Sequence, residues 1–197
     1  MKKICVFAGS NAGVSPEYEQ AAMQLGQWIA ANQYELIYGG SKIGLMGRVA
    51  NTVLEAGGTV IGVMPRNLFT GEMVHKGLTK LYEVNSMHER KALMSELCDA
   101  YVSLPGGLGT YEELFEVLSW SQLGIHKKPV GLLNVRGFYD PLMAMLQKTV
   151  DAGFMRESNL SLVQCEAQVE TLLEKMNNYV PAAQTNKWDE LPSQAAQ

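Results

Sequence analysis

The sequence predicts an α/β fold in which one parallel β-sheet is covered by helices on both faces. Short apolar runs alternate with longer amphipathic segments along the chain, and most of the runs end in a turn that contains glycine or proline. Unbroken apolar runs are typical of strands buried on both faces, and strand–helix alternation is typical of parallel sheets. Because crossovers between parallel strands are right-handed, we expect a doubly wound, Rossmann-like arrangement.

The individual elements follow from local patterns. Strands are predicted at the apolar runs, which are residues 4–8, 36–38, 59–64, 81–84, 101–104, 130–133 and 160–163. Helices are predicted over residues 16–32, from about 45 to the glycines at 57 and 58, from Ser86 and Thr110 onward, and near 140–152 and 166–178. Ser15 is expected to cap the first helix, with Pro16 at its first position. Residues 66–78 are expected to form an irregular loop.

The length and composition predict a single domain. The chain has 197 residues, of which 47% are hydrophobic and 18% charged, as is ordinary for a globular protein. One Rossmann-like domain is expected over residues 1–179. Residues 180–197 contain Pro, Gln, Ala and Asn with few apolar side chains, and are expected to form a C-terminal tail.

The charge balance and the cysteines limit the possible partners. With 16 basic and 20 acidic residues the formal net charge is −4, which is unfavourable for a nucleic-acid groove. The three scattered cysteines favour a reducing compartment, and the N-terminal apolar run is too short for a signal peptide or a membrane span. We therefore expect a cytoplasmic protein that binds neither nucleic acid nor membranes. The three histidines, His75, His88 and His126, are too scattered to predict a metal site.

The glycine turn at residues 105–110, Pro-Gly-Gly-Leu-Gly-Thr, is the sharpest local signal. Glycines leave backbone N–H groups unobstructed, and the first N–H groups of the following helix attract an anion. The alternative is a plain turn in which Thr110 and Glu113 form a capping box. The turn lacks the Gly-Lys-Ser/Thr ending of a triphosphate-binding loop, so a monophosphate is the expected ligand.

A second cluster of polar residues follows the fourth predicted strand. Ser86 and Glu89 fit a capping box, which places Arg90 and Lys91 in the first turns of a helix. Cations there oppose the helix dipole at a cost of up to about 1 kcal/mol, which indicates an anionic partner. The alternative is a solvated pair on a surface helix. The carboxylates that follow the glycine turn are explained by the dipole of their own helix alone; these are Glu112, Glu113 and Glu116.

Together the two patterns resemble a known family. Pro105-Gly106-Gly107-x-Gly109-Thr110-x-x-Glu113, with Met87-His88-x-Arg90-Lys91 upstream, closely resembles the LONELY GUY (LOG) family of cytokinin riboside 5′-monophosphate phosphoribohydrolases. The likeness extends over residues 4–178 and includes the turns at 9–10, 39–47 and 137–141. Family members have been labelled lysine decarboxylases. That activity needs pyridoxal phosphate and a Schiff-base lysine, for which the sequence gives no context, so no cofactor is expected.

The resemblance implies an activity and a set of site residues. The activity is cleavage of the N-glycosidic bond of an N6-substituted AMP, which gives free base and ribose 5-phosphate. Glu113 would stabilise the oxocarbenium-like state or activate water, and Arg90 would orient the nucleotide and assist the departing base. The glycine turn would hold the phosphate through Gly106, Gly107, Gly109 and Thr110. The nucleotide pocket would be lined by Ser10, Gly40, Met46, Met64, Met87 and Lys91.

The helix at residues 110–124 has apolar side chains nearly all round its axis. One face can pack on the sheet and the other needs a partner, which the family's homodimer would supply. Two other function classes stay open at this point. A non-catalytic nucleotide sensor would need no carboxylate beside the ribose, and a Rossmann oxidoreductase would need a ribose-binding acid after the second strand, where Ser41 and Lys42 stand.

Overall fold

A computed structural model describes residues 1–66 and 73–181 of the chain. Seven strands form one sheet in the order β4-β3-β2-β1-β5-β6-β7, and every neighbouring pair is parallel. The strands are β1 (Lys3–Phe7), β2 (Glu35–Tyr38), β3 (Thr59–Pro65), β4 (Lys80–Val84), β5 (Ala100–Ser103), β6 (Val130–Leu133) and β7 (Val163–Glu166). The predicted parallel sheet is therefore confirmed.

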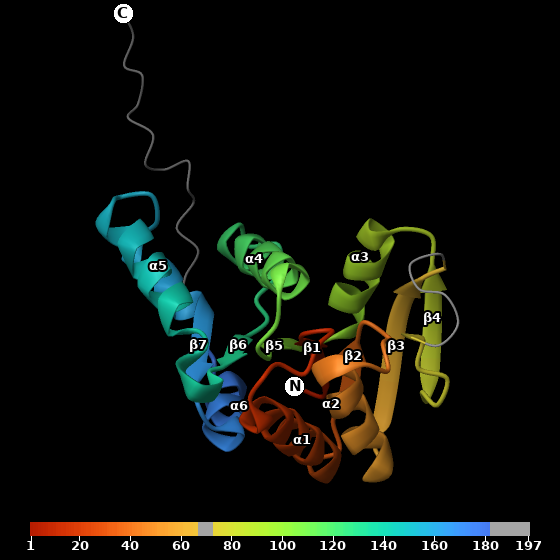
Figure 1. The fold of residues 1–197 in the computed structure, drawn as a ribbon. Coiled ribbons are helices and arrows are strands. Elements are labelled where there is room, and N and C mark those ends of the chain that lie inside the picture. The colour runs from red at the N-terminus through yellow and green to blue at the C-terminus, as the bar shows by residue number, and fades with distance from the viewer. Residues whose placement is uncertain (67–72, 182–197) are drawn as a thin grey trace, which may run out of the picture.

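The helices form a layer on each side of the sheet (Figure 1). One layer contains α1 (Pro16–Ala31), α2 (Gly44–Glu55) and α6 (Val169–Asn177). The other contains α3 (Met87–Leu97), α4 (Leu108–Gln122) and α5 (Asp140–Asp151). Strands β2, β3 and β4 are added on one side of β1, and β5, β6 and β7 on its other side. The sheet is therefore doubly wound, and the order in which its strands are added reverses between β1 and β5.

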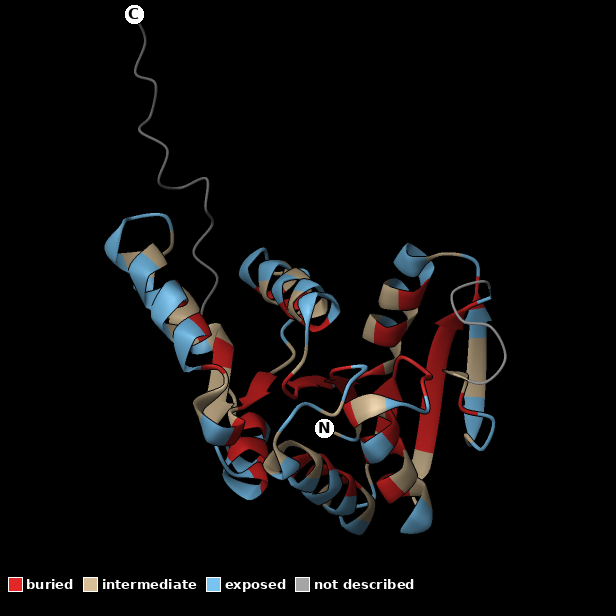
Figure 2. Ribbon diagram, viewed as in Figure 1, coloured by how far each residue is buried: buried red, intermediate tan, exposed pale blue. Residues whose placement is uncertain are grey.

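Side-chain alternation along β1 builds a separate core under each helix layer. Ile4 and Val6 pack in the cluster beneath α1 and α2, whereas Cys5 and Phe7 pack in the cluster beneath α3 and α4. The five inner strands are buried almost throughout, as Figure 2 shows, which explains why they read as unbroken apolar runs. The edge strands β4 and β7 are mostly half-buried or exposed. None of the helices within 1–66 and 73–181 is long and apolar enough to cross a membrane.

Two predicted boundaries are wrong. Residues Glu157–Leu162 form a 3₁₀-helix, and β7 begins only at Val163, where the sequence predicts a strand at 160–163. Local hydrogen bonds explain the difference, because the Ser161 hydroxyl donates to the Ser158 carbonyl at 2.7 Å and stabilises a helical turn there. The last helix, α6, begins at Val169 rather than 166.

The remaining boundaries are closer to the predictions. Pro16 is the first residue of α1, as expected, and Ser86 caps α3 by accepting a hydrogen bond from the Glu89 N–H at 3.1 Å. Another 3₁₀-helix covers Val135–Gly137. Most of the predicted tail, and residues 67–72 of the predicted loop, lie outside the described residues, so the division into a domain over 1–179 and a tail stays a prediction.

Candidate active site

Three turns meet between β1 and β5, at the point where the strand order of the sheet reverses. The Gly9 N–H after β1 donates to the Pro105 carbonyl after β5 at 3.1 Å, and the Gly9 carbonyl accepts from the Leu45 N–H at the start of α2 at 3.0 Å. A ligand of an open parallel sheet binds in the crevice at this point. The turns that follow β1 and β5 and the start of α2 therefore lie together at one edge of the sheet.

The turn at 105–110 combines a crowded glycine with two open ones. A Cβ on Gly106 would lie 2.1 Å from the Thr110 hydroxyl oxygen and 2.9 Å from the Gly9 nitrogen, so this position accepts no side chain. A Cβ on Gly107 or Gly109 would meet no atom within 4 Å. Gly107 is the N-cap of α4, and the first N–H groups of a helix have no partner within it, which is the arrangement that attracts an anion.

The capping-box alternative for this turn is wrong. Helix α4 begins at Leu108, so Thr110 lies inside its first turn and is buried there. Glu113 lies in the second turn and does not return to cap the helix. Within the described part of the chain, no side chain caps the start of α4. The N–H groups of the turn are thus left for another acceptor.

Arg90 of α3 reaches across the ends of two strands, where two hydrogen bonds hold its guanidinium against Gly39. Its Nε donates to the Val63 carbonyl of β3 at 3.1 Å, and its Nη1 donates to Glu113 Oε1 at 2.9 Å. Its Nη2 occupies the place where a side chain on Gly39 would begin, because a Cβ there would be only 2.1 Å away. The absence of a side chain at Gly39 is what lets the guanidinium lie over β2.

The Arg90–Glu113 ion pair is buried. The side chains are only 9% and 12% exposed, so the alternative of a solvated cation pair on a surface helix is wrong. Burial raises the pKa of the Glu113 carboxyl above its ordinary value of 4.5, while the charge and hydrogen bond of Arg90 act in the opposite direction. The site therefore contains a carboxyl with a raised pKa and a fixed cation, a combination typical of catalytic centres.

Lys91, the cation next to Arg90 in α3, faces two other carboxylates of α4. Its Nζ lies 2.5 Å from Glu112 Oε1 and 2.9 Å from Glu116 Oε1. The helix-dipole explanation for these carboxylates is wrong, because α4 begins at Leu108 and its first turn, residues 108–111, precedes all of them. Their partners are instead the cations of α3. The predicted contact of Lys91 with the nucleotide stays a prediction.

The other predicted lining residues surround Arg90 from β2, β3 and α2. Gly40 has a φ of +80°, and a Cβ there would lie 3.1 Å from Met64 Cε. The Met46 sulfur would be 3.4 Å from a Cβ on Gly39, beside the guanidinium. Met87 is the first residue of α3 and is partly exposed. Gly40, Met46 and Met64 thus lie close together next to Arg90.

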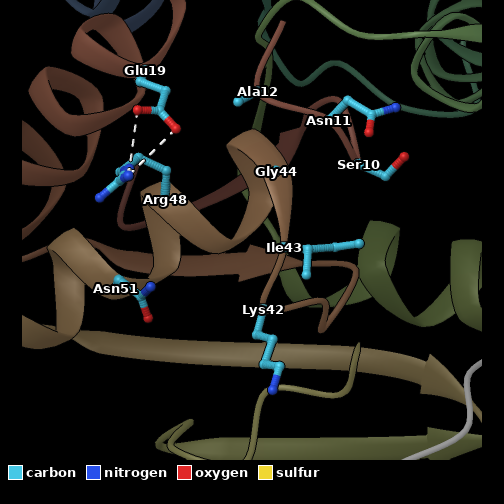
Figure 3. Close-up of a pocket in the computed structure, with 9 residues that line it drawn as sticks. All are labelled: Ser10, Asn11, Ala12, Glu19, Lys42, Ile43, Gly44, Arg48 and Asn51. Atoms are coloured by element: carbon cyan, nitrogen blue, oxygen red, sulfur yellow. Dashed lines mark hydrogen bonds and ion pairs between the residues drawn. The ribbon is translucent and has the colours of Figure 1, made fainter. Parts of the chain in front are cut away.

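Ser10 faces a cavity of about 370 Å³ at the start of α2, shown in Figure 3. This cavity is bounded by α1 and α2, whereas Arg90 and Glu113 lie under α3 and α4 on the other face of the sheet. Two cations line it, of which Arg48 is bound to Glu19 at 3.3 Å. Its lining residues are Ser10, Asn11, Ala12, Glu19, Lys42, Ile43, Gly44, Arg48 and Asn51.

Several positioning residues have only weak sequence signals. The buried Tyr139 hydroxyl donates to the Leu104 carbonyl at 2.7 Å and so fixes the strand end that leads into the glycine turn. The sequence predicts only a turn at Gly39, and it gives Glu112 and Glu116 no partner. Among residues 1–66 and 73–181, no group of three or more His, Cys, Asp and Glu side chains could hold a metal ion.

Fold and site together define a class of protein: a doubly wound α/β protein with an uncapped glycine turn and a buried acid–cation pair near the switch point of its sheet. The family described as "Possible lysine decarboxylase" matches residues 46–176.

Two plant relatives are similar over most of the chain. A probable cytokinin riboside 5′-monophosphate phosphoribohydrolase of Oryza sativa, LOGL9, is 47% identical over 180 residues, which are 91% of this chain and 79% of the relative. The cytokinin riboside 5′-monophosphate phosphoribohydrolase LOG2 of Arabidopsis thaliana is 43% identical over 91% of this chain and 84% of its own length. The chain belongs to this LOG family, as its motifs predict.

Solved structures agree on the fold. The crystal structure of the protein TM1055 is 26% identical and has a TM-score of 0.70 over 91% of this chain and 100% of that one. The molybdenum cofactor carrier protein of Chlamydomonas reinhardtii is 24% identical, with a TM-score of 0.67 over 90% of this chain and 99% of the carrier. The second likeness is one of fold alone.

Proposed function

We propose that this chain hydrolyses the N-glycosidic bond of AMP or an N6-substituted AMP, giving the free base and ribose 5-phosphate. The names of the plant relatives describe this activity on cytokinin riboside 5′-monophosphates. The observation that carries the proposal for this chain is the buried Arg90–Glu113 pair, in which Glu113 belongs to the helix that starts at the glycine turn and has no side-chain cap.

The glycine turn is suited to the 5′-phosphate. The N–H groups at the start of α4 and the helix dipole attract a dianion, and the open space over Gly107 and Gly109 leaves room for its oxygens. Gly106 and Thr110 pack against each other and shape the turn, and Ser10 follows the strand next to it. Gly40, Met46, Met64 and Met87 would line the rest of the nucleotide, with the methionines forming an adaptable apolar wall for the base substituent.

The Arg90–Glu113 pair is suited to the reaction. As the bond between C1′ and the base breaks, the base takes the electron pair and positive charge develops on the ribose. An ionised Glu113 stabilises that charge or takes a proton from the attacking water, whose oxygen ends on C1′. Arg90, fixed to Val63 and Glu113, orients the nucleotide and assists the departing base.

The site does not suit a lysine decarboxylase. That reaction needs a lysine that becomes neutral, so that its amine can form a Schiff base with pyridoxal phosphate. The hydrogen bonds of Lys91 to Glu112 and Glu116 raise its pKa, which keeps the ammonium charged. The lysine that lies beside the Arg90–Glu113 pair is thus in the opposite state from the one a Schiff base requires.

A homodimer formed through α4 is the second part of the proposal. The sheet side of α4 is buried, whereas Phe115 of α4, and Leu123 and Ile125 just after its end, are exposed in the single chain, Leu123 by 62%. An apolar face of this kind marks a protein interface. The mildly acidic charge and three free cysteines support a cytoplasmic location.

The experiment is an incubation with AMP and with N6-isopentenyl-AMP, followed by chromatography of the products. We expect free base and ribose 5-phosphate from the wild type, and none from Glu113→Gln, which removes the charge but keeps the shape of the side chain. Nucleotide that is bound but intact would instead support a non-catalytic sensor. Nucleoside and inorganic phosphate as products would contradict the proposed bond cleavage.

A further inference from the structure

Helices α3 and α4 are joined by charged side chains on the face that carries the proposed active site. Two adjacent cations of α3 meet three carboxylates of α4. Arg90 binds Glu113 at 2.9 Å, while Lys91 binds Glu112 at 2.5 Å and Glu116 at 2.9 Å. Each of the two cations of α3 therefore binds different carboxylates of α4.

Lys91 is enclosed between its two partners. Glu112 and Glu116 are four residues apart, so their carboxylates lie one above the other on the same side of α4 and can both reach one ammonium. The Lys91 side chain is only 12% exposed, and the two hydrogen bonds raise the pKa of its ammonium. A side chain held in this way fixes its own backbone relative to α4.

Apolar packing between the two helices is incomplete at the same place. A void of about 10 Å³, room for about one water molecule, lies beside Lys91 and is also lined by Glu113, Glu116, Met94 and Val117. An interface with a void has fewer van der Waals contacts to set the distance between its helices. The ion pairs therefore carry more of that task here.

From this arrangement we infer that Lys91, clamped between Glu112 and Glu116, is a positioning residue that holds α3 where Arg90 meets Glu113. The inference rests on the proposed function, since it assigns Arg90 and Glu113 to the reaction. Lys91 adjoins Arg90 in the chain, so any movement of α3 that releases Lys91 also displaces Arg90. The competing interpretation is that Lys91 leaves its carboxylates and binds the nucleotide itself.

Two sets of substitutions separate these interpretations. Lys91→Met removes the cation, and the double variant Glu112→Gln/Glu116→Gln removes its partners but leaves the lysine. If Lys91 positions Arg90, both changes break the same clamp, and both lower kcat on the order of tenfold with KM within about twofold of the wild type. Lys91→Arg, which keeps the charge, retains most of the wild-type kcat.

A contact with the nucleotide would give a different pattern. Lys91→Met would then raise KM for AMP, whereas the double variant would free the lysine and leave KM unchanged or lower it. That pattern would overturn the inference, and so would a Lys91→Met variant with wild-type kcat and KM. Far-ultraviolet circular dichroism and thermal unfolding of each variant establish that it is folded.

A readout without turnover tests the clamp directly. Arg90 Nε–H donates to the Val63 carbonyl in a buried position, so its ¹⁵N-detected proton exchange reports how well the guanidinium is fixed. The signal is assigned by its loss in Arg90→Lys. We expect exchange on the order of tenfold faster in Lys91→Met and in the double variant alike. Unchanged exchange in both would overturn the inference.

The two measurements also distinguish failure of this inference from failure of the proposed function. If the wild type releases no base from AMP or N6-isopentenyl-AMP, the proposed function fails, while proton exchange at Arg90 still decides whether Lys91 holds it. If the wild type is active and Lys91→Met behaves as a loss of substrate binding, only the positioning role fails.

Discussion

Gly39 offers the sharpest test of how the site is built. A Cβ at this position would lie 2.1 Å from Nη2 of Arg90 and 3.4 Å from the Met46 sulfur. An ordinary contact needs about 3.5 Å, so Gly39→Ala requires the guanidinium to move by about 1.4 Å. The end of an arginine is usually free to move that far. Here it is not, because Nε and Nη1 are bound to the Val63 carbonyl and to Glu113 at 3.1 and 2.9 Å.

The expected magnitude follows from those two bonds. A displacement of this size takes at least one of them beyond hydrogen-bond distance. Removing one partner of a buried ion pair costs about 3–5 kcal/mol, and a displaced partner should cost less, about 2 kcal/mol of unfolding free energy. Misplacing a catalytic group by about 1 Å lowers the rate roughly 100-fold. We therefore expect Gly39→Ala to lose about 100-fold in kcat/KM for AMP.

A double-variant cycle provides the control. In Arg90→Ala the guanidinium is gone, so adding Gly39→Ala should change the urea-unfolding free energy by less than about 0.5 kcal/mol. The same alanine in the wild-type background should cost about 2 kcal/mol. Wild-type kcat/KM in Gly39→Ala, or an equal cost in both backgrounds, would refute the inferred contact between Gly39 and Arg90.

Four further outcomes are expected. Because burial raises the pKa of Glu113 above 4.5, kcat should fall as pH drops through that raised pKa, which lies above the range of a free glutamate. Because its pKa is raised in the folded state, Glu113 contributes to stability at low pH, and this contribution is lost as pH rises through the folded-state pKa. The urea-unfolding free energy, measured from pH 4 to 8, should show this decrease in the wild type and not in Glu113→Gln. Gly106→Ala should lower the melting temperature and raise KM for AMP at least tenfold, because its Cβ would collide with the Thr110 hydroxyl. A Cβ on Gly107 would meet no atom within 4 Å, so Gly107→Ala should melt at the wild-type temperature, and equal melting temperatures for the two variants would contradict this. Leu123→Glu should convert a dimer to a monomer in light scattering, and an unchanged mass would remove α4 from the interface.

The fold could be predicted because its information is local. Strands buried on both faces produce apolar runs such as that of β1, and Pro16 and Ser86 mark helix starts by their own chemistry. Residues 160–163 could not be assigned correctly, because a short run with two leucines fits a strand or a helical turn equally well. Serine hydroxyl bonding decided between the two.

The glycine turn of the site could be predicted from the spacing of its residues. The ion pairs between α3 and α4 could not. The sequence predicted the glycine turn at 105–110 and the start of a helix after it, and phosphate binding there stays a prediction. The cations Arg90 and Lys91 indicated anionic partners, and the partners observed are carboxylates. Their partners lie more than 20 residues further along, on α4. Pairing at that separation depends on how two helices pack on one sheet. The sequence therefore indicated only the dipole of their own helix as a reason for Glu112 and Glu116.

The position of a bound nucleotide decides whether the glycine turn and the Arg90–Glu113 pair form one active site. The measurement is a crystal structure of Glu113→Gln with AMP, which should bind without being cleaved. We expect the phosphate on the N–H groups at Gly107, with C1′ of the ribose beside residue 113 and Arg90 next to the base. A phosphate held instead in the cavity beside Lys42 and Arg48, with the ribose away from residue 113, would contradict the proposed function.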